Sequence, residues 1–290
     1  MKKILSIIAT SLLWVSSAEA GVPLIQEQGN SRYTIQLDSI SMTIDANGGK
    51  ILSFRYGNQE AISQLKWPNA FGSTFWTSPQ KEWYWPPIPE YDKLPYTVKQ
   101  ENSSLVMTSQ ISPTQQYQIT KQFSADPTDD AVIVSYTITN KSPRTRQVAP
   151  WEITRVINDG NGLIFFDADL SGITPAGLMN FKAADGAVWY QPDVADQNRK
   201  INADGKGWLA YYNHGLLLLK KFQDLDVSQP APEEAEIQVY VNRGKTYIEL
   251  ESQGAYTTLE PDQSLTWTVR WYLRRVNGDP TLPLLLEAVK

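Results

Sequence analysis

Hydrophobic and polar residues alternate along most of the chain, in short runs that are separated by turn-forming residues. The clearest run is 131–139, in which the even-numbered residues are all apolar, and 247–253 alternates in the same way. A period of two residues is typical of a β-strand with one buried face. On this basis the predicted strands are 33–37, 40–44, 50–56, 96–100, 105–111, 117–124, 131–139, 148–156, 163–166, 188–190, 208–212, 216–222, 237–241, 247–253 and 265–273.

Turn chemistry and the lack of helical periodicity complete the fold prediction. Gly, Asn, Asp and Pro lie between the predicted strands, as in 45–49, 126–130 and 213–215. A helix is predicted only near the C-terminus, over 282–289. Short strands at this spacing indicate an all-β sandwich. Because no change in composition marks a linker, we expect a single domain over residues 21–290.

The segment 71–91, FGSTFWTSPQKEWYWPPIPEY, breaks the alternation and is the part of the chain richest in aromatic residues. Proline cannot donate a hydrogen bond to a strand ladder, so this aromatic segment is predicted to be a long ordered loop. Indole faces on a stiff backbone suit the apolar faces of sugar rings. The alternative is that the rings cap one open end of the core. Both hold if some rings are buried and others line a pocket.

The first 20 residues have the composition of a cleavable export signal. Lys2 and Lys3 form a positive start, 4–15 is mostly apolar, and the Ala-Glu-Ala sequence at 18–20 fits a cleavage site. The apolar stretch is too short for a transmembrane helix with these flanks. We therefore expect a mature chain that begins at Gly21, does not insert into a membrane and is periplasmic or secreted.

The composition excludes several classes of protein. The sequence contains no Cys, one His, 10 Trp and 14 Tyr, and its formal net charge is −5. Disulfides, thiolate chemistry and sites built from several histidines are thereby excluded. A mildly acidic chain without a basic stripe is a poor candidate for binding nucleic acid or an anionic membrane. The composition instead favours binding surfaces made of aromatic rings.

Sequence motifs for common cofactors and catalytic centres are absent. The chain has no phosphate-binding glycine loop, serine nucleophile elbow or HExxH motif, so we expect no cofactor. A calcium site made of carboxylates stays open, because 126–130 and 167–169 are rich in Asp. Asp-rich segments of this kind are more often turns, and the prediction is therefore no metal site.

Several short motifs occur in a fixed order along the predicted strands. They are GGKILS at 48–53, GNQE at 57–60, LESQ at 250–253 and LEPDQS at 259–264, followed by the aromatic strand 267–273. Together they resemble the galactose mutarotase-like (aldose 1-epimerase) superfamily, and WTSPQ with WYWPP in the aromatic segment resembles a secreted bacterial branch of it. The resemblance implies a large β-supersandwich of twisted antiparallel sheets, with a sugar-binding cleft on one sheet.

The same resemblance implies a catalytic residue. In the mutarotases, a glutamate in a Leu-Glu-x-Gln context is the general base that takes the anomeric hydroxyl proton, and Glu251 is the matching position. The family's acid is a histidine in a His-x-Tyr-Phe strand, which this chain lacks. The only histidine, His214, lies in a predicted turn. Glu152 is the other candidate acid, if burial raises its pKa.

The candidate sugar-binding residues come from the aromatic segment and from the predicted strand 148–156. Glu152 and Arg155 are three residues apart in that strand, so they point to opposite faces and we expect no direct pair between them. The candidates are Trp76, Gln80, Trp83, Trp85, Trp151 and Arg155.

These observations lead to one expected function and two alternatives. We expect an exported protein that binds a mono- or oligosaccharide. The first alternative is a sugar epimerase or mutarotase that uses a glutamate as its general base. The second is an envelope protein that uses the sandwich for contacts with other proteins.

Overall fold

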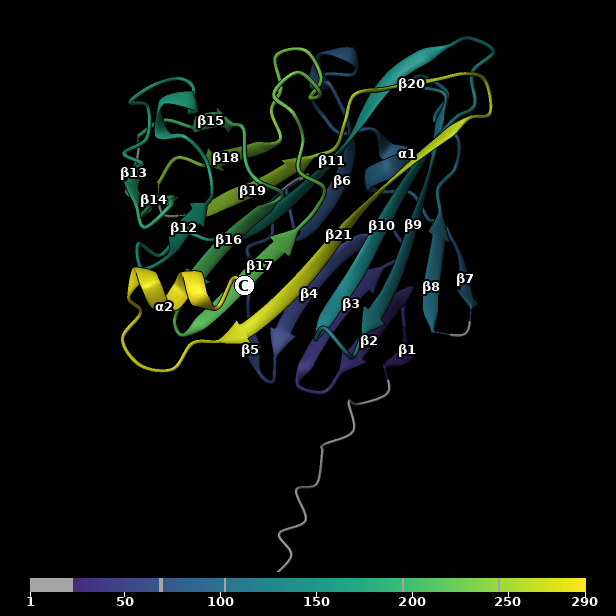
Figure 1. Cartoon of the computed structure of the whole chain (residues 1–290). Helices are drawn as coiled ribbons and strands as arrows, with labels where there is room; N and C mark the ends of the chain where they lie inside the picture. Colours follow the sequence, from purple (N-terminus) through teal and green to yellow (C-terminus); the bar gives the residue numbers. More distant parts are fainter. Residues whose placement is uncertain (1–22, 68–69, 102, 195, 245) are drawn as a thin grey trace, which may run out of the picture.

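A computed structural model of the chain shows two large β-sheets that face each other (Figure 1). The structure describes residues 23–67, 70–101, 103–194, 196–244 and 246–290, so the predicted export signal lies outside the described residues. The predicted all-β sandwich is confirmed.

One sheet has 11 strands within the described residues. In spatial order its main path is β1 (Leu24–Gly29), β2 (Arg32–Leu37), β3 (Ile40–Asp45), β4 (Lys50–Tyr56), β6 (Ser73–Ser78), β11 (Arg146–Ile157), β19 (Tyr247–Gln253), β18 (Ile237–Val241) and β15 (Arg199–Ala203). Two short strands lie off this path, namely β5 (Gln59–Glu60) beside β4 and β20 (Thr257–Leu259) beside β11.

The other sheet has 10 strands in the same described part of the chain. Their spatial order is β13 (Lys182–Ala184), β14 (Ala187–Tyr190), β12 (Leu163–Phe166), β16 (Trp208–Asn213), β17 (Leu216–Lys221), β21 (Ser264–Arg275), β10 (Ala131–Asn140), β9 (Tyr117–Asp126), β8 (Ser104–Thr108) and β7 (Thr97–Glu101). The helical elements are η1 (Gln80–Glu82), α1 (Pro89–Asp92), η2 (Leu170–Gly172) and α2 (Leu282–Glu287). None of the described helices is long and apolar enough to cross a lipid bilayer.

The main hydrophobic core fills the space between the two sheets. β10 contributes Val132, Val134, Tyr136 and Ile138 from one face, as the alternation predicted. Its antiparallel pairing with β9 and β21 runs without a break in register, so the apolar residues stay on the core side along the whole strand. Each such side chain contributes about 1.5–3 kcal/mol by leaving water.

A second, smaller core lies on the outer face of the 10-stranded sheet, beneath α2 (Figure 1). Leu217 and Leu219 of β17 pack there with Leu285 of the helix, whereas Leu216 and Leu218 belong to the main core. β17 is therefore buried on both faces, which explains its unbroken run of four leucines. The predicted C-terminal helix is confirmed.

The aromatic segment is not a loop throughout, because Ser73–Ser78 forms β6 in the middle of the 11-stranded sheet. β6 pairs with β11. Phe75 stacks on Tyr136 in the main core with ring centroids 4.2 Å apart, while Trp76 belongs to a separate cluster outside that core. Both faces of β6 are covered, so its sequence shows no alternation, and the prolines begin only at Pro79. The loop prediction was wrong for these six residues.

Candidate functional site

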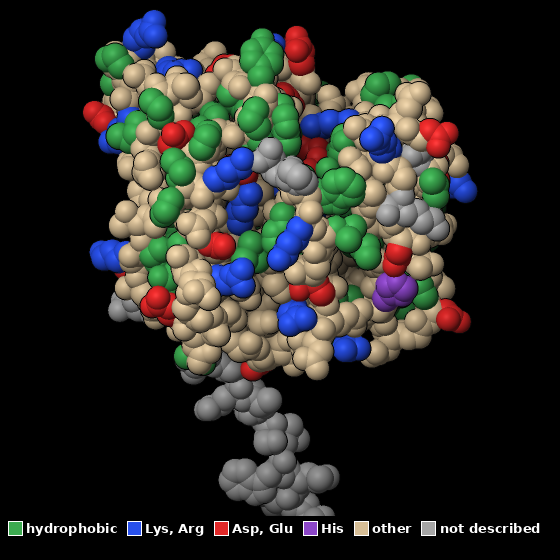
Figure 2. Space-filling model, turned by 180° about the vertical axis from the view of Figure 1, so that it is seen from behind, with side chains coloured by type: hydrophobic (Ala, Val, Ile, Leu, Met, Phe, Trp, Pro, Cys, Tyr) green, Lys and Arg blue, Asp and Glu red, His purple; other side chains and the backbone are tan. Residues whose placement is uncertain are grey.

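A cavity of about 390 Å³ opens on the outer face of the 11-stranded sheet. This side of the molecule is shown in Figure 2, where hydrophobic side chains lie beside acidic and basic ones. The volume is within the usual range of ligand pockets. The lining residues are Trp67, Ala70, Trp76, Gln80, Trp85, Trp151, Lys200, Tyr240, Tyr247, Glu249 and Glu251.

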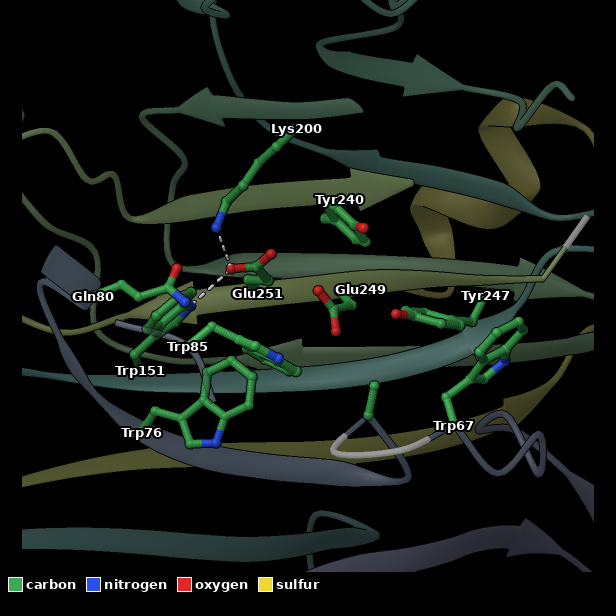
Figure 3. Close-up of a pocket in the computed structure, with 11 residues that line it drawn as sticks. Trp67, Trp76, Gln80, Trp85, Trp151, Lys200, Tyr240, Tyr247, Glu249 and Glu251 are labelled. Atoms are coloured by element: carbon green, nitrogen blue, oxygen red, sulfur yellow. Dashed lines mark hydrogen bonds and ion pairs between the residues drawn. The ribbon is translucent and has the colours of Figure 1, made fainter. Parts of the chain in front are cut away.

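β19 supplies the central residues of the cavity (Figure 3). Tyr247, Glu249 and Glu251 line the cavity, whereas Ile248 and Leu250 lie in the main core. The predicted alternation of this strand is confirmed. It allows two carboxylates to lie one residue away from the hydrophobic interior, because successive side chains point to opposite faces of the sheet.

Glu251 is buried, and only one of its two carboxylate oxygens is bound by the protein. Oε2 accepts hydrogen bonds from Trp151 Nε1–H and from Lys200 Nζ, both at 2.8 Å. Within the described residues, Oε1 accepts none. Burial raises the pKa of Glu251; the Lys200 charge opposes this rise and the Glu249 charge adds to it. A carboxylate of this kind can accept a proton from a ligand hydroxyl.

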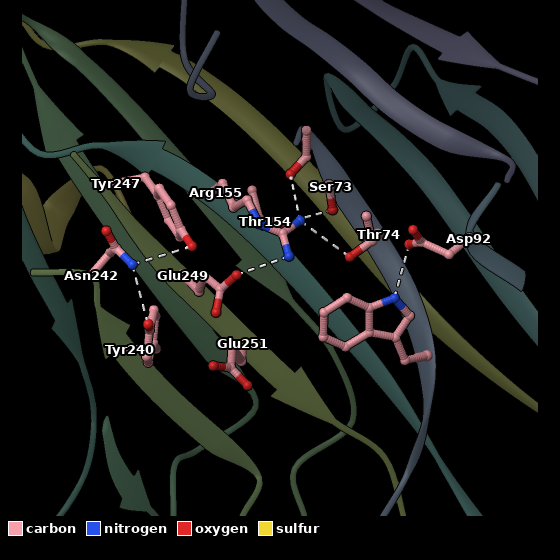
Figure 4. Close-up of polar contacts among 12 residues, drawn as sticks. Ser73, Thr74, Asp92, Thr154, Arg155, Tyr240, Asn242, Tyr247, Glu249 and Glu251 are labelled. Carbon is pink, nitrogen blue, oxygen red and sulfur yellow. Dashed lines mark hydrogen bonds and ion pairs between the residues drawn. The ribbon is translucent and has the colours of Figure 1, made fainter. Parts of the chain in front are cut away.

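Glu249 lies two residues before Glu251 on the same face and is paired with Arg155 (Figure 4). Its Oε1 is 2.8 Å from Arg155 Nη2. Arg155 Nη1 in turn donates to Gly72 O at 3.4 Å and to Thr74 Oγ1 at 3.3 Å. Arg155 is buried and is not one of the lining residues, so it acts by holding Glu249 in place.

Two tyrosines complete the polar part of the cavity. Asn242 Nδ2 donates to the hydroxyl of Tyr240 at 3.2 Å and to that of Tyr247 at 3.5 Å (Figure 4). Burial raises the pKa of both hydroxyls, so they stay protonated at neutral pH. Within the described residues neither hydroxyl donates a hydrogen bond, so both can donate to a ligand.

Aromatic rings stand at both ends of the cavity (Figure 3). At one end, Trp76 makes edge-to-face contacts with Trp85 and Trp151, with ring centroids 6.0 Å and 5.4 Å apart. At the other, Trp67 and Tyr247 are 6.1 Å apart. Trp85 and Trp67 are 53% and 44% exposed, whereas Trp76 and Trp151 are buried. The partly exposed rings can therefore pack against a ligand.

Two further predicted residues lie next to this aromatic wall. Gln80 lines the cavity, and its backbone N–H donates to Glu234 Oε1 at 3.3 Å. Trp83 packs 5.6 Å from Trp76 and donates its Nε1–H to Thr77 O at 2.8 Å. Trp83 supports the wall but is not one of the lining residues.

The two candidate acids do not share this cavity with Glu251. Glu152 is on the inner face of β11, where its carboxylate binds Lys220 Nζ at 3.0 Å and Tyr136 OH at 2.6 Å. His214 is in the turn between β16 and β17 and borders a different cavity of about 350 Å³. These placements give neither residue a route to a ligand held by Glu251.

The reasons for these two placements differ. Glu152 faces inward because the residues of β11 alternate, and Arg155 faces the opposite side, as its spacing from Glu152 predicted. His214 has a positive φ of 47° in a two-residue hairpin turn, and its Nε2 is 2.7 Å from Asp159 Oδ2. The hairpin turn therefore places His214 beside the second cavity, away from Glu251.

Several residues of the site were not selected from the sequence. The alternation around Glu251 was a usable signal for Glu249 and Tyr247. Trp67, Lys200 and Tyr240 had no such signal. Lys200 of β15 pairs with Tyr240 of β18, and Tyr240 pairs with Glu249 of β19, so these three are neighbours only through the register of the sheet.

The Asp-rich segments have protein partners. Arg270 Nη2 is 2.7 Å from Asp126 and 2.6 Å from Asp129, and Asp169 Oδ1 accepts the backbone N–H of Ser171 at 2.8 Å. No group of three or more potential metal-binding side chains was found in the described part of the chain. These carboxylates therefore act as ion-pair partners and turn formers.

Comparison with known proteins identifies the fold. No protein-family model matches the sequence, and no curated protein matches it. Among solved structures, a candidate aldose 1-epimerase from Escherichia coli K12 has a TM-score of 0.59 and 14% identity, over 84% of this chain and 99% of that one. A galactose mutarotase-like protein from Lactobacillus casei ATCC 334 has a TM-score of 0.56 and 13% identity, over 84% and 100%.

A third similar structure is a TPR-domain containing protein from Parabacteroides distasonis ATCC 8503. Its TM-score is 0.62 at 11% identity, over 87% of this chain and 49% of that one. At these identities the likeness concerns the fold. The chain has the galactose mutarotase-like fold, and the resemblance seen in the sequence motifs is confirmed at that level.

Proposed function

We propose that this protein is an exported carbohydrate-binding protein whose ligand, a mono- or oligosaccharide, occupies the cavity on β19. The observation that carries the proposal is the combination of six aromatic side chains with two carboxylates, each of which has one oxygen without a hydrogen bond from the described residues. A sugar presents apolar ring faces and a rim of hydroxyl donors, and this cavity offers surfaces for both.

Three further observations support the proposal. The aromatic rings stand at the ends of the cavity and the carboxylates lie between them, which matches a flat ring with polar edges (Figure 3). The structures that share this fold include a galactose mutarotase-like protein. The signal-like composition of residues 1–20 supports the export part of the proposal.

Calorimetry on residues 21–290, guided by a glycan array, tests the proposal. We expect at least one sugar to bind with one site per chain, and Glu249→Gln or Trp85→Ala to weaken it. Asp159→Asn, in the other cavity, is the matched control and should bind like the wild type. Absence of binding across the array, or equal binding by all variants, would contradict sugar binding at this cavity.

A second candidate function is anomeric interconversion, which the surroundings of Glu251 favour. Its Oε1 has no hydrogen bond from the described residues, and burial raises its pKa toward the range that suits a general base at neutral pH. The base would take the proton of the anomeric hydroxyl while an acid protonates the ring oxygen, and the bond between C1 and the ring oxygen would break to give the open-chain aldehyde. Ring closure on the other face of the aldehyde, with both proton transfers reversed, would give the other anomer. Among the lining residues, Lys200, Tyr240 and Tyr247 carry protons that could serve the acid step.

Exchange NMR on a sugar that binds separates the two candidates. A binding protein leaves the spontaneous mutarotation rate unchanged, whereas an epimerase raises it. If the rate rises, we expect Glu251→Gln to abolish the increase while binding persists, because the amide keeps the shape but cannot take a proton. An increase that survives Glu251→Gln would exclude Glu251 as the base.

A further inference from the structure

We propose that the cavity prefers a sugar with a free, protonated amino group over its neutral, N-acetylated and acidic counterparts. This inference rests on the proposed function, because it concerns the ligand of the same site. Its basis is the charge of the cavity wall, the free carboxylate oxygens and the aromatic rings around them.

The charged residues that line the cavity are not balanced. Two carboxylates, Glu249 and Glu251, face the cavity with one ammonium, that of Lys200. Lys200 Nζ is committed to Glu251 Oε2 at 2.8 Å, and it lies 4.7 Å from the centre of the Trp151 ring. The cation paired with Glu249, Arg155, is buried outside the lining. A ligand in the cavity therefore contacts two carboxylates but only one of the two cations that pair with them.

Each of the two carboxylates has one oxygen available to a ligand. Glu249 binds Arg155 through Oε1 and Glu251 binds its partners through Oε2, which leaves Glu249 Oε2 and Glu251 Oε1 without hydrogen bonds in the described part of the chain. The two residues alternate on one strand, so their Cα atoms are about 7 Å apart. An ammonium has three donors and can bind both oxygens, whereas a hydroxyl has one donor.

The surroundings favour a cation for two further reasons. Trp67, Trp76, Trp85, Tyr240 and Tyr247 bring aromatic rings to the same cavity, and ring faces attract a desolvated ammonium. Burial raises the pKa of Glu251, so a cation bound beside it would stabilise the ionised carboxylate. A carboxylate or phosphate on the sugar would instead be repelled by Glu249 and Glu251.

Three tetrasaccharides with one skeleton provide the test. Chitosan, chitin and cellulose tetrasaccharides are all β-1,4-linked and differ at C2 in carrying an ammonium, an acetamide or a hydroxyl. Glucosamine and galactosamine with their neutral parents extend the series to other shapes. We expect calorimetry at about pH 5.5, where sugar amines are protonated, to show binding of the amine about tenfold tighter than its hydroxyl partner.

Salt and substitutions identify the cause. Raising the salt concentration should reduce the preference, because a part-exposed charge contact is screened. Glu249→Gln removes the charge of one of the two carboxylates and should lower the affinity for the amine several-fold more than that for the neutral sugar. Glu251→Gln should do the same, and it provides a second variant if Glu249→Gln does not fold. Asp159→Asn is the matched control and should keep the wild-type preference.

The outcomes distinguish this inference from the proposed function. Binding of neutral or acetylated sugars as tight as that of their amines would overturn the inference and leave sugar binding standing. An amine preference unchanged in both glutamine variants would also overturn it, because the charge would then act elsewhere. If no member of the series and no sugar on the array binds, both proposals fail.

Discussion

Glu152 and Glu251 are both buried, but their surroundings give them different chemistry. Glu152 is bound by Lys220, Tyr136 and Trp271, and both of its oxygens are used within the main core. Glu251 faces a cavity, and its Oε1 has no hydrogen bond from the residues that the structure describes. Burial alone therefore does not identify a reactive carboxylate. What matters is which oxygens have partners and which face of the sheet they occupy.

Trp151 holds Glu251 through a single hydrogen bond, which makes its effect measurable. The Nε1–H of Trp151 favours the ionised carboxylate, so it lowers a pKa that burial has raised. We expect Trp151→Phe to raise the pKa of Glu251 further, as measured by NMR titration of the labelled carboxyl. Trp189→Phe, whose indole donates to Ala184 O instead, is the control. An unchanged titration in Trp151→Phe would show that this hydrogen bond has no influence.

Two tryptophans of the aromatic wall should respond differently to truncation. Trp85 is 53% exposed, so Trp85→Ala should weaken sugar binding by about 1–3 kcal/mol with little loss of stability. Trp76 is buried and donates its Nε1–H to Asp92 at 3.0 Å, so Trp76→Ala should lower the free energy of unfolding by about 3–5 kcal/mol. Urea unfolding and calorimetry on both variants check this. Equal losses of stability would show that Trp85 also belongs to the packed core.

At the scale of elements, the segment between β17 and β18 contacts both Gln80 at the cavity and the turn between β15 and β16. Glu236 accepts the backbone N–H groups of Gly207 at 2.9 Å and Leu225 at 3.2 Å, which ties this segment to the β15–β16 turn. Glu234 accepts the backbone N–H of Gln80 at the cavity. The position of Gln80 therefore depends on a segment far from it in sequence.

Glu236 should make stability depend on pH. Burial raises its pKa to about 7, so between about pH 4.5 and 7 the folded protein keeps a proton that the unfolded chain releases. The contribution of Glu236 to the free energy of unfolding is fully present below about pH 4.5, and it is lost as the pH rises through the folded-state pKa of about 7. Relative to Glu236→Gln, the wild type should lose on the order of 1–3 kcal/mol across this window. Urea unfolding at several pH values measures this, and parallel curves would contradict it.

At the scale of the whole molecule, a buried ion pair joins the two sheets. Lys220 of β17 and Glu152 of β11 are fully buried and 3.0 Å apart, and Lys220 Nζ also donates to Leu250 O at 3.1 Å. Burial lowers the pKa of Lys220, while the Glu152 charge opposes this change. The pair links the two sheets across the core, so it helps to hold the sheet that carries the cavity against the other sheet.

Removing one member of this pair should cost more than removing both charges. Lys220→Met leaves Glu152 buried without its cation and should lower the free energy of unfolding by about 3–5 kcal/mol. Adding Glu152→Gln should restore part of that loss, because the amide oxygen can still accept from Tyr136. Lys221→Met, next along the strand and only partly buried, is the control. Additive losses from the two substitutions would mean that the pair is not coupled.

The sequence by itself determined most of the strands, the turns between them, the C-terminal helix and the fold class, because period-two alternation and turn residues are local signals. It also placed Glu251 and Arg155 each on a definite face of its strand. It missed β1, β5, β13, β15 and β20. It did not reveal β6, because a strand covered on both faces has no alternation to detect. Alternation along a strand shows which face is buried only when the other face is polar.

Only the tertiary structure decided which faces meet and which of them borders a cavity. Trp67, Lys200 and Glu251 lie far apart in sequence and line one cavity because β6, β11, β19, β18 and β15 are neighbours in the sheet. The same pairing placed Glu152 inside the core and His214 beside another cavity. Strand order and register depend on contacts between distant segments, and no single segment encodes them.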